Sequence, residues 1–107
     1  MSKIKVEDLK LKFIDACNLI DGSLLPLDNG DLVCKVNDSK IVFHNKHWIS
    51  LVRDDNNRVE LFDVDDIEIY DKNFLITQNN RKWTAFIYKN KKVELLGNSM
   101  SINMMLD

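Results

Sequence analysis

From Gly30 onward the chain alternates apolar and polar residues at a period of two, and this alternation limits the possible folds more than any other feature. A period of two is typical of β-strands. The segments are rich in Val, Ile, Phe, Tyr and Trp and are joined by short polar connections. Parallel strands need crossovers of about a dozen residues or more, so we expect an antiparallel meander whose neighbouring strands pair in sequence order. The predicted strands are Asp31–Val36, Lys40–His44, Trp48–Arg53, Arg58–Val64, Ile67–Tyr70, Asn73–Gln78, Lys82–Tyr88 and Lys92–Leu96.

A helix is predicted before the meander, over residues of about 4–21. Its apolar residues recur at helical spacing and form one stripe: Val6, Leu9, Phe13, Ala16, Cys17 and Ile20. Gly22 is expected to end the helix in the left-handed conformation, and Pro26 discourages a restart. The predicted fold class is α+β, with the N-terminal helix packed on a curved antiparallel β-meander of about six to nine strands that forms a half-barrel or small barrel.

The length of 107 residues predicts a single globular domain over residues 1–107. Its sheet is predicted at about 31–97, followed by a tail or last strand at about 98–107. In that last segment Ser99, Ser101 and Asn103 alternate with Met100, Ile102 and Met104. The alternation fits a strand that closes the sheet. A disordered tail and a methionine-rich strand that augments a partner's sheet are the alternatives.

Two hairpins of the meander resemble each other: "WISLVRDDNNRVELF", from Trp48, and "WTAFIYKNKKVELL", from Trp83. Chance and duplication account for the resemblance about equally well. In both first strands the two faces are largely apolar, as in strands that are covered on both sides. We therefore predict that Trp48 and Trp83 occupy related, buried positions.

The formal net charge is −2, which gives no overall attraction to nucleic acid or to an anionic membrane. An acidic segment at 54–71 nevertheless precedes a basic one at 72–92. Such charges keep a domain soluble, and a polarised surface also steers a protein partner. The candidate partner-binding carboxylates are Asp63, Asp65, Asp66 and Glu68. An alternative nucleic-acid-binding surface would interleave basic residues with the aromatic Trp83 and Tyr88. Its candidate contacts are Arg81, Lys82, Lys89, Lys91 and Lys92.

The two histidines of the chain, His44 and His47, lie in the stretch "VFHNKHW". If Asn45 and Lys46 form a two-residue hairpin turn, the histidines face each other. Two imidazoles are too few for a metal site, because zinc takes three or four protein ligands and nothing adjacent supplies the others. We predict no metal or other cofactor, and we include His44 and His47 among the candidate contacts of a partner.

Sequence motifs for catalysis are weak. The three glycines are not grouped into a phosphate-binding loop. Cys34, Ser39 and Ser50 lie near the histidines in sequence, but no nucleophile-elbow motif accompanies them. The acidic stretch "DVDDIE" lacks the glycine and the spacing of a calcium-binding loop. We therefore expect that the protein is not an enzyme.

The sequence "MSKIKVEDLK" at the N-terminus has no apolar segment of signal-peptide length, and no window approaches the about 20 apolar residues that span a bilayer. Cys17 and Cys34 are expected to be buried thiols in a reducing compartment. These features predict a cytoplasmic protein without a membrane partner. The frequent use of Asn, Lys, Asp and Ile is typical of an AT-rich bacterial or viral genome.

The polarised charge and the lack of a catalytic motif predict a small non-catalytic protein-binding domain, such as an inhibitor, an immunity protein or a phage or bacterial accessory protein. Another protein is the expected partner, and a homodimer through a sheet edge or the C-terminal segment is a further expectation. The alternatives are a small barrel that binds single-stranded nucleic acid and a structural subunit of a larger assembly.

Overall fold

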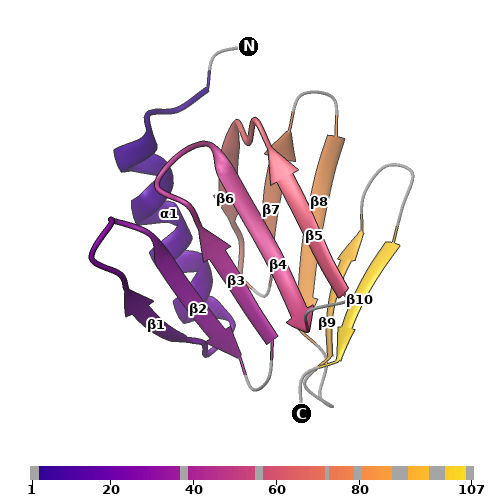
Figure 1. Ribbon diagram of the computed structural model, residues 1–107. Helices are drawn as coiled ribbons and strands as arrows, with labels where there is room; N and C mark the ends of the chain where they lie inside the picture. Colours follow the sequence, from indigo (N-terminus) through magenta and orange to yellow (C-terminus); the bar gives the residue numbers. More distant parts are fainter. Residues whose placement is uncertain are drawn as a thin grey trace.

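The computed structural model describes residues 3–36, 39–54, 57–71, 73–78, 81–87, 92–96 and 101–105, with side chains at 3–36, 39–52, 58–71 and 74–78. Its architecture is α+β, with one N-terminal helix and antiparallel sheets, as the sequence predicts (Figure 1). In the orientation of Figure 1 the first sheet lies in front, and the helix and the second sheet lie behind it. One face of the first sheet is therefore turned away from the rest of the described chain.

The helix α1 spans Val6–Leu19, and its buried residues Leu9, Phe13, Ala16 and Cys17 form the predicted apolar stripe. Asp21, rather than Gly22, takes the left-handed conformation after the helix, with a φ of 55°. The N–H of Gly22 then donates to the carbonyl of Cys17 at 2.9 Å. Aspartate tolerates this conformation better than most residues. The expectation that Gly22 takes it is wrong.

The first sheet has the order β1-β2-β3-β4-β5, and its neighbouring strands are antiparallel. The bounds are β1 Ser23–Pro26, β2 Leu32–Val36, β3 Ser39–Phe43, β4 Trp48–Asp54 and β5 Asn57–Phe62. The sequence does not predict β1, because the stretch Leu24-Leu25-Pro26 neither alternates nor suits an interior strand. As an edge strand, β1 tolerates the proline.

The second sheet has the order β10-β9-β8-β7-β6, again with antiparallel neighbours. The bounds are β6 Asp66–Ile69, β7 Asn73–Gln78, β8 Arg81–Ile87, β9 Lys92–Leu96 and β10 Ser101–Met105. The meander thus divides after β5, where Asp63 has a φ of 54°. Within the described residues, ten strands in two sheets take the place of the predicted single meander of about six to nine strands.

The two similar hairpins differ by one residue in register. Ser50, two residues after Trp48, pairs with Glu60. Phe86, three residues after Trp83, pairs with Glu94. Because successive residues of a strand alternate between faces, the two tryptophans do not occupy related positions. The side chain of Trp83 lies outside the described residues.

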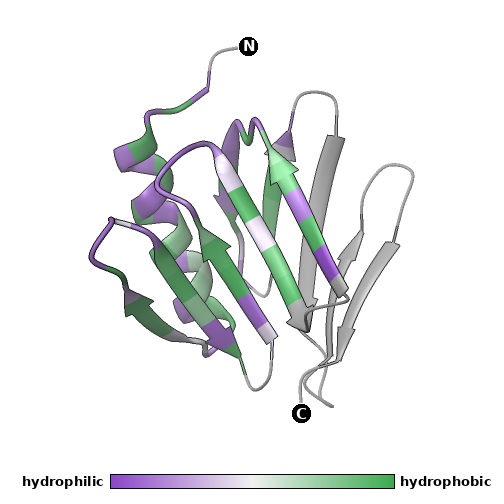
Figure 2. Cartoon of the chain, in the orientation of Figure 1, coloured by the Kyte–Doolittle hydropathy of each residue, from purple (hydrophilic) through white to green (hydrophobic). Residues whose placement is uncertain are grey.

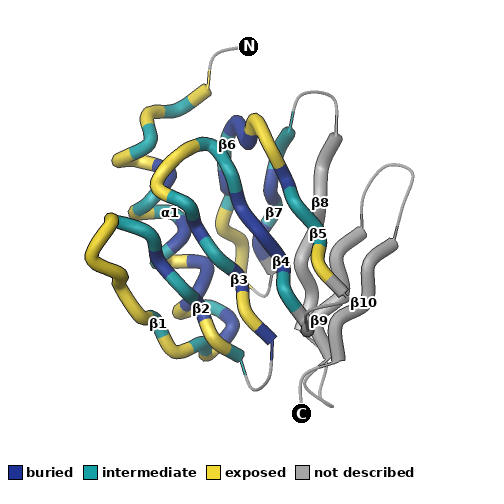
Figure 3. The backbone as a smooth tube through the Cα atoms, viewed as in Figure 1, coloured by how far each residue is buried: buried dark blue, intermediate teal, exposed yellow. Residues whose placement is uncertain are grey.

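One hydrophobic core joins the helix to both sheets, and its residues are among those coloured as buried in Figure 3. The first sheet contributes Leu32, Cys34, Ile41, Phe43, Ile49, Leu51 and Leu61, and the second contributes Ile67, Phe74 and Ile76. The rings of Phe13 and Phe43 lie 5.7 Å apart, which places α1 against β3. In Figure 2, hydrophobic residues recur along β2 to β4, whereas the connecting turns are mostly hydrophilic.

A disulfide joins Cys17 of α1 to Cys34 of β2, with their Cα atoms 5.8 Å apart. Both cysteines are buried. The prediction that both cysteines are buried is confirmed. The prediction that they are free thiols is wrong, because the apolar stripe of α1 and the inner face of β2 meet at Cys17 and Cys34.

Gly22 lies against this disulfide. A Cβ at Gly22 would lie 2.8 Å from Sγ of Cys17 and closer still to Sγ of Cys34. The lack of a side chain at Gly22 therefore makes room for the bond between helix and sheet.

Within the described residues, α1 is neither long enough nor apolar enough to cross a membrane.

Candidate functional site

The turn between β3 and β4 determines where the two histidines lie. Phe43 pairs with Ile49, and the N–H of His44 donates to the carbonyl of Trp48 at 3.1 Å. The turn therefore contains Asn45, Lys46 and His47, with Asn45 at a φ of 52°. The predicted two-residue turn is wrong by one residue, so His44 faces Trp48 rather than His47.

The two histidines bind different parts of the molecule. His47 donates from Nε2 to the carbonyl of Ile4 at 2.7 Å and accepts from the N–H of Val64 at 2.9 Å through its own carbonyl. His44 stacks on Trp48, with ring centroids 3.6 Å apart and an angle of 11° between the planes. His47 thus fastens the N-terminal segment, whereas His44 belongs to the outer face of the first sheet.

Trp48 lies between two aromatic rings. His44 covers one side, and the ring of Phe62 lies 5.3 Å away at an angle of 26°. The indole N–H donates to Oε2 of Glu60 at 2.8 Å. Trp48 is half-buried rather than buried, contrary to the sequence prediction. Its orientation is fixed by stacking and by a hydrogen bond to a charged group.

Glu60 is the acceptor at the centre of this site. Burial alone would raise the pKa of Glu60, but hydrogen bonds from Ser50, Trp48 and Arg58 together outweigh it and hold the pKa below its ordinary value. Because Ser50 gives its one hydrogen to ionised Glu60, its oxygen accepts from Nε2–H of His44. The second ring nitrogen, Nδ1 of His44, carries no proton when the ring is neutral, and it lies 3.9 Å from Oδ2 of Asp31.

Burial lowers the pKa of His44, although Asp31 and Glu60 act in the opposite direction. The folded state therefore favours neutral His44, and the unfolded state binds the proton more readily. We expect the free energy of unfolding to decrease as the pH falls below about 6.5, the ordinary pKa, until His44 is protonated in the folded state as well. Urea titrations between pH 7.5 and 5 measure this slope, which should be smaller in His44→Gln. The pKa of Glu60 is also lowered, but Glu60 reduces the free energy of unfolding only as the pH falls below its ordinary pKa of 4.5. The pH ranges in which His44 and Glu60 act are therefore separate. An equal slope in both proteins would contradict this assignment.

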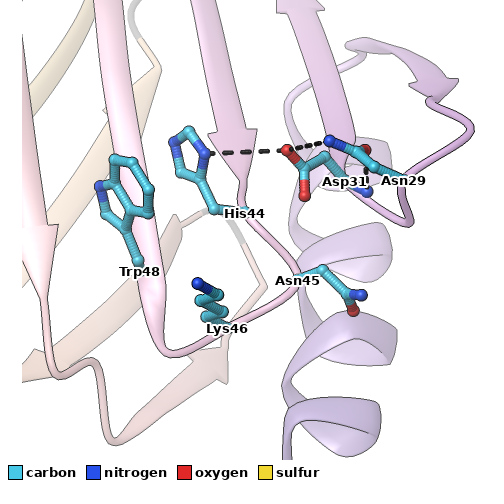
Figure 4. Close-up of a pocket in the computed structure, with 6 residues that line it drawn as sticks. All are labelled: Asn29, Asp31, His44, Asn45, Lys46 and Trp48. Atoms are coloured by element: carbon cyan, nitrogen blue, oxygen red, sulfur yellow. Dashed lines mark hydrogen bonds and ion pairs between the residues drawn. The ribbon is translucent and has the colours of Figure 1, made fainter.

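A pocket of ≈ 280 Å³ lies between the turn after β3 and the loop before β2 (Figure 4). It is lined by Asn29, Asp31, His44, Asn45, Lys46 and Trp48. Asn29 accepts from the N–H of Asp31 at 3.0 Å and donates to its carboxylate at 3.2 Å. Gly30 has a φ of 93°, and a Cβ there would lie 2.6 Å from Nδ2 of Asn45. Glycine is therefore needed where the two loops meet.

The order Asp31, His44, Ser50 is that of a hydrolase triad, but the geometry does not provide an available nucleophile. The hydroxyl of Ser50 is 0% exposed and donates to Glu60. The distance of 3.9 Å from His44 to Asp31 is too long for a hydrogen bond. The described residues also contain no group of three or more His, Cys, Asp or Glu side chains that could hold a metal ion.

Two of the predicted acidic contacts are paired with lysines of the N-terminal segment. Asp63 and Lys3 form an ion pair at 2.8 Å, and Asp66 and Lys12 form another at 2.8 Å. The hydrogen bond from Lys3 lowers the pKa of Asp63. These pairs neutralise part of the acidic segment.

The other two acidic candidates are also engaged. Asp65 is buried, and its N–H donates to the carbonyl of Thr77 at 2.8 Å. Glu68 accepts from the hydroxyl of Tyr70 at 2.7 Å, and this hydrogen bond raises the pKa of Tyr70. The four carboxylates therefore do not form one free acidic patch.

Three of the five basic candidates lie on described strands of the second sheet. Arg81 and Lys82 begin β8, and Lys92 begins β9. Lys89 and Lys91 fall outside the described residues, as do the side chains of the other three. The nucleic-acid surface proposed from this cluster stays a prediction.

Strand register places three rows of residues on the outer face of the first sheet. The aromatic row contains His44, Trp48 and Phe62; the middle row contains Val33, Val42, Ser50 and Glu60; the basic row contains Lys35, Lys40, Val52 and Arg58. No described helix or strand lies over this face in Figure 1.

This surface was not predicted from the sequence, although its residues occupy alternate positions of each strand. The correct turn length after β3 was the missing information, because a shift of one residue moves a side chain to the opposite face.

A search for known relatives found no protein-family model, curated protein or solved structure that matches this chain.

Proposed function

We propose that this protein is a small non-catalytic protein-binding domain that acts through the outer face of its first sheet. The observation that carries the proposal is the fixed position of Trp48 between His44 and Phe62. Rigid aromatic side chains are frequent at the centres of protein interfaces, since binding then costs little conformational entropy. Phe62 is 53% exposed and offers a partner apolar area beside Trp48.

A non-catalytic role is supported by the burial of Ser50 beneath this face. An inhibitor, an immunity protein or a bacterial or phage accessory protein needs a preorganised surface and no reactive group. His44 is the one candidate contact from sequence analysis that belongs to this surface.

The alternative of single-stranded nucleic acid is favoured by a specific observation, because Lys35, Lys40 and Arg58 share the face with Trp48. Basic and aromatic side chains together form nucleic-acid grooves. However, the ring of His44 stacks on the indole at 3.6 Å and that of Phe62 lies 5.3 Å away, so both rings compete with a base for Trp48. We therefore place a protein partner first.

A structural subunit and a homodimer through a sheet edge are the remaining alternatives. The half-barrel curvature and the cytoplasmic location predicted from the sequence also stay proposals. The disulfide between Cys17 and Cys34 is more typical of an oxidising compartment than of the cytoplasm.

The test is affinity capture from the native host with Phe62→Ser as bait beside the wild type. We expect a specific partner protein to bind the wild type and to be lost with Phe62→Ser, because the exposed ring supplies contact area. Leu11→Ser is the matched control: Leu11 is 61% exposed on α1, so its loss removes apolar surface elsewhere. The measurement is the amount of partner recovered from nuclease-treated extract by each bait.

Equal capture by the wild type and Phe62→Ser would overturn the proposed surface. Capture that disappears with nuclease would favour nucleic acid. Recovery of this chain alone, with a dimer mass in solution, would favour self-association.

A further inference from the structure

We propose that the outer face of the first sheet receives an acidic amphipathic helix of the partner, laid across β2 to β5. The inference rests on the proposed function and names the chemistry of the element that binds.

Two lysines on this face oppose each other directly. Lys35 of β2 pairs with Lys40 of β3, and both are exposed. Neither lysine forms an ion pair within the described residues. Like charges directly opposite each other destabilise a sheet. A carboxylate from a ligand would remove this repulsion, so the pair is complementary to an acidic partner.

The next cation of the basic row is already partly neutralised. Arg58 donates to Glu60 at 3.1 Å, and Glu60 holds Trp48 through its other oxygen. The free positive charge is therefore concentrated at Lys35 and Lys40, on the side of the sheet that is nearer to β1. Partner carboxylates should contact that side first.

The spacing between the rows suits one helix. Lys40 of the basic row and His44 of the aromatic row are four residues apart along the same segment, or about 13 Å at the rise of a strand. An α-helix with its side chains is about 10–12 Å in diameter. A helix that runs along the rows would contact lysines with one edge and aromatic rings with the other.

The middle row fits the underside of such a helix. Val33 and Val42 are half-buried and apolar, and they lie side by side between the lysines and the aromatic row. The matching helix has carboxylates along one edge and apolar residues along its centre and other edge. A single nucleic-acid strand offers flat base faces for stacking on aromatic rings rather than an aliphatic centre for Val33 and Val42.

The probe is a synthetic helical peptide of about 15 residues, with Leu on one face and Glu on the other. We expect it to bind the wild-type protein in a fluorescence-anisotropy titration at low salt. The double variant Lys35→Glu with Lys40→Glu should weaken binding by about tenfold or more, because attraction becomes repulsion. Added salt should weaken wild-type binding as well.

The control is Lys5→Glu with Lys10→Glu, which makes the same change in net charge on the N-terminal segment and α1. It should bind the peptide nearly as well as the wild type. A second peptide with Lys in place of Glu should not bind.

Equal loss in both double variants, or no binding of the acidic peptide, would overturn the inference. Lysine-dependent binding of a single-stranded oligonucleotide without binding of the peptide would overturn it in favour of nucleic acid. If Phe62→Ser abolishes partner capture while the Lys35 and Lys40 variant captures normally, the proposed function stands and the acidic helix is wrong.

Discussion

Replacing Phe43 with alanine is expected to lower the free energy of unfolding by about 3–5 kcal/mol. Phe43 is 0% exposed and packs on Phe13, so it connects α1 to the inner face of the first sheet. Removal of the ring loses apolar burial and leaves a cavity that neighbouring strands are too constrained to fill. Urea unfolding, followed by circular dichroism, measures the change.

Phe62→Ala is the matched control, because it makes the same substitution in the same sheet on the opposite face. Phe62 is largely exposed, so we expect a cost of about 1 kcal/mol or less. Equal destabilisation by the two substitutions would contradict the assignment of inner and outer faces.

Removal of the disulfide has the second largest expected effect. Cys17→Ala with Cys34→Ala should lower the free energy of unfolding by about 3 kcal/mol, since the bond closes a loop with a sequence separation of 17. Reduction of the wild-type protein should have a similar effect. The double variant should unfold at the same urea concentration with and without reductant.

The prediction would be contradicted if reductant did not change the unfolding of the wild-type protein and if two free thiols reacted in the unfolded protein without reductant. That outcome would restore the buried thiols expected from sequence. Gly22→Ala adds a separate check, because a methyl group there has no room beside an intact disulfide. The substitution should be less harmful in the cysteine-free background.

The helix and the antiparallel pairing were predictable because each rests on a local pattern. Leu9, Phe13 and Cys17 repeat at helical spacing. Strands β2 to β9 are joined by connections too short for crossovers. The division into two sheets was not predictable, since it depends on the backbone at Asp63, where a left-handed residue turns the chain. Strand β1 was not predicted because Pro26 has no N–H to donate to a neighbouring strand. An edge strand tolerates this loss, because one of its sides has no neighbouring strand.

The site was only partly predictable, because it depends on register. The sequence placed His44 and Trp48 near the same turn. The predicted turn was one residue too short, so it paired Phe43 with Trp48, whereas Phe43 pairs with Ile49 in the structure. Charge along the sequence was equally incomplete as a guide. It indicated free carboxylates at Asp63 and Asp66, whereas Lys3 and Lys12 from the other end of the described chain pair with them.

The contacts that His47 makes with Ile4 and Val64 have a consequence for the order of folding. The N-terminal segment is synthesised first, yet its anchor at His47 comes 43 residues later, and the partners of Lys12 and Lys3 come 54 and 60 residues later. Contacts between distant residues slow folding, because a long loop must close before they form. On the ribosome, α1 must therefore wait with its apolar stripe unburied until the first sheet and the start of β6 have emerged.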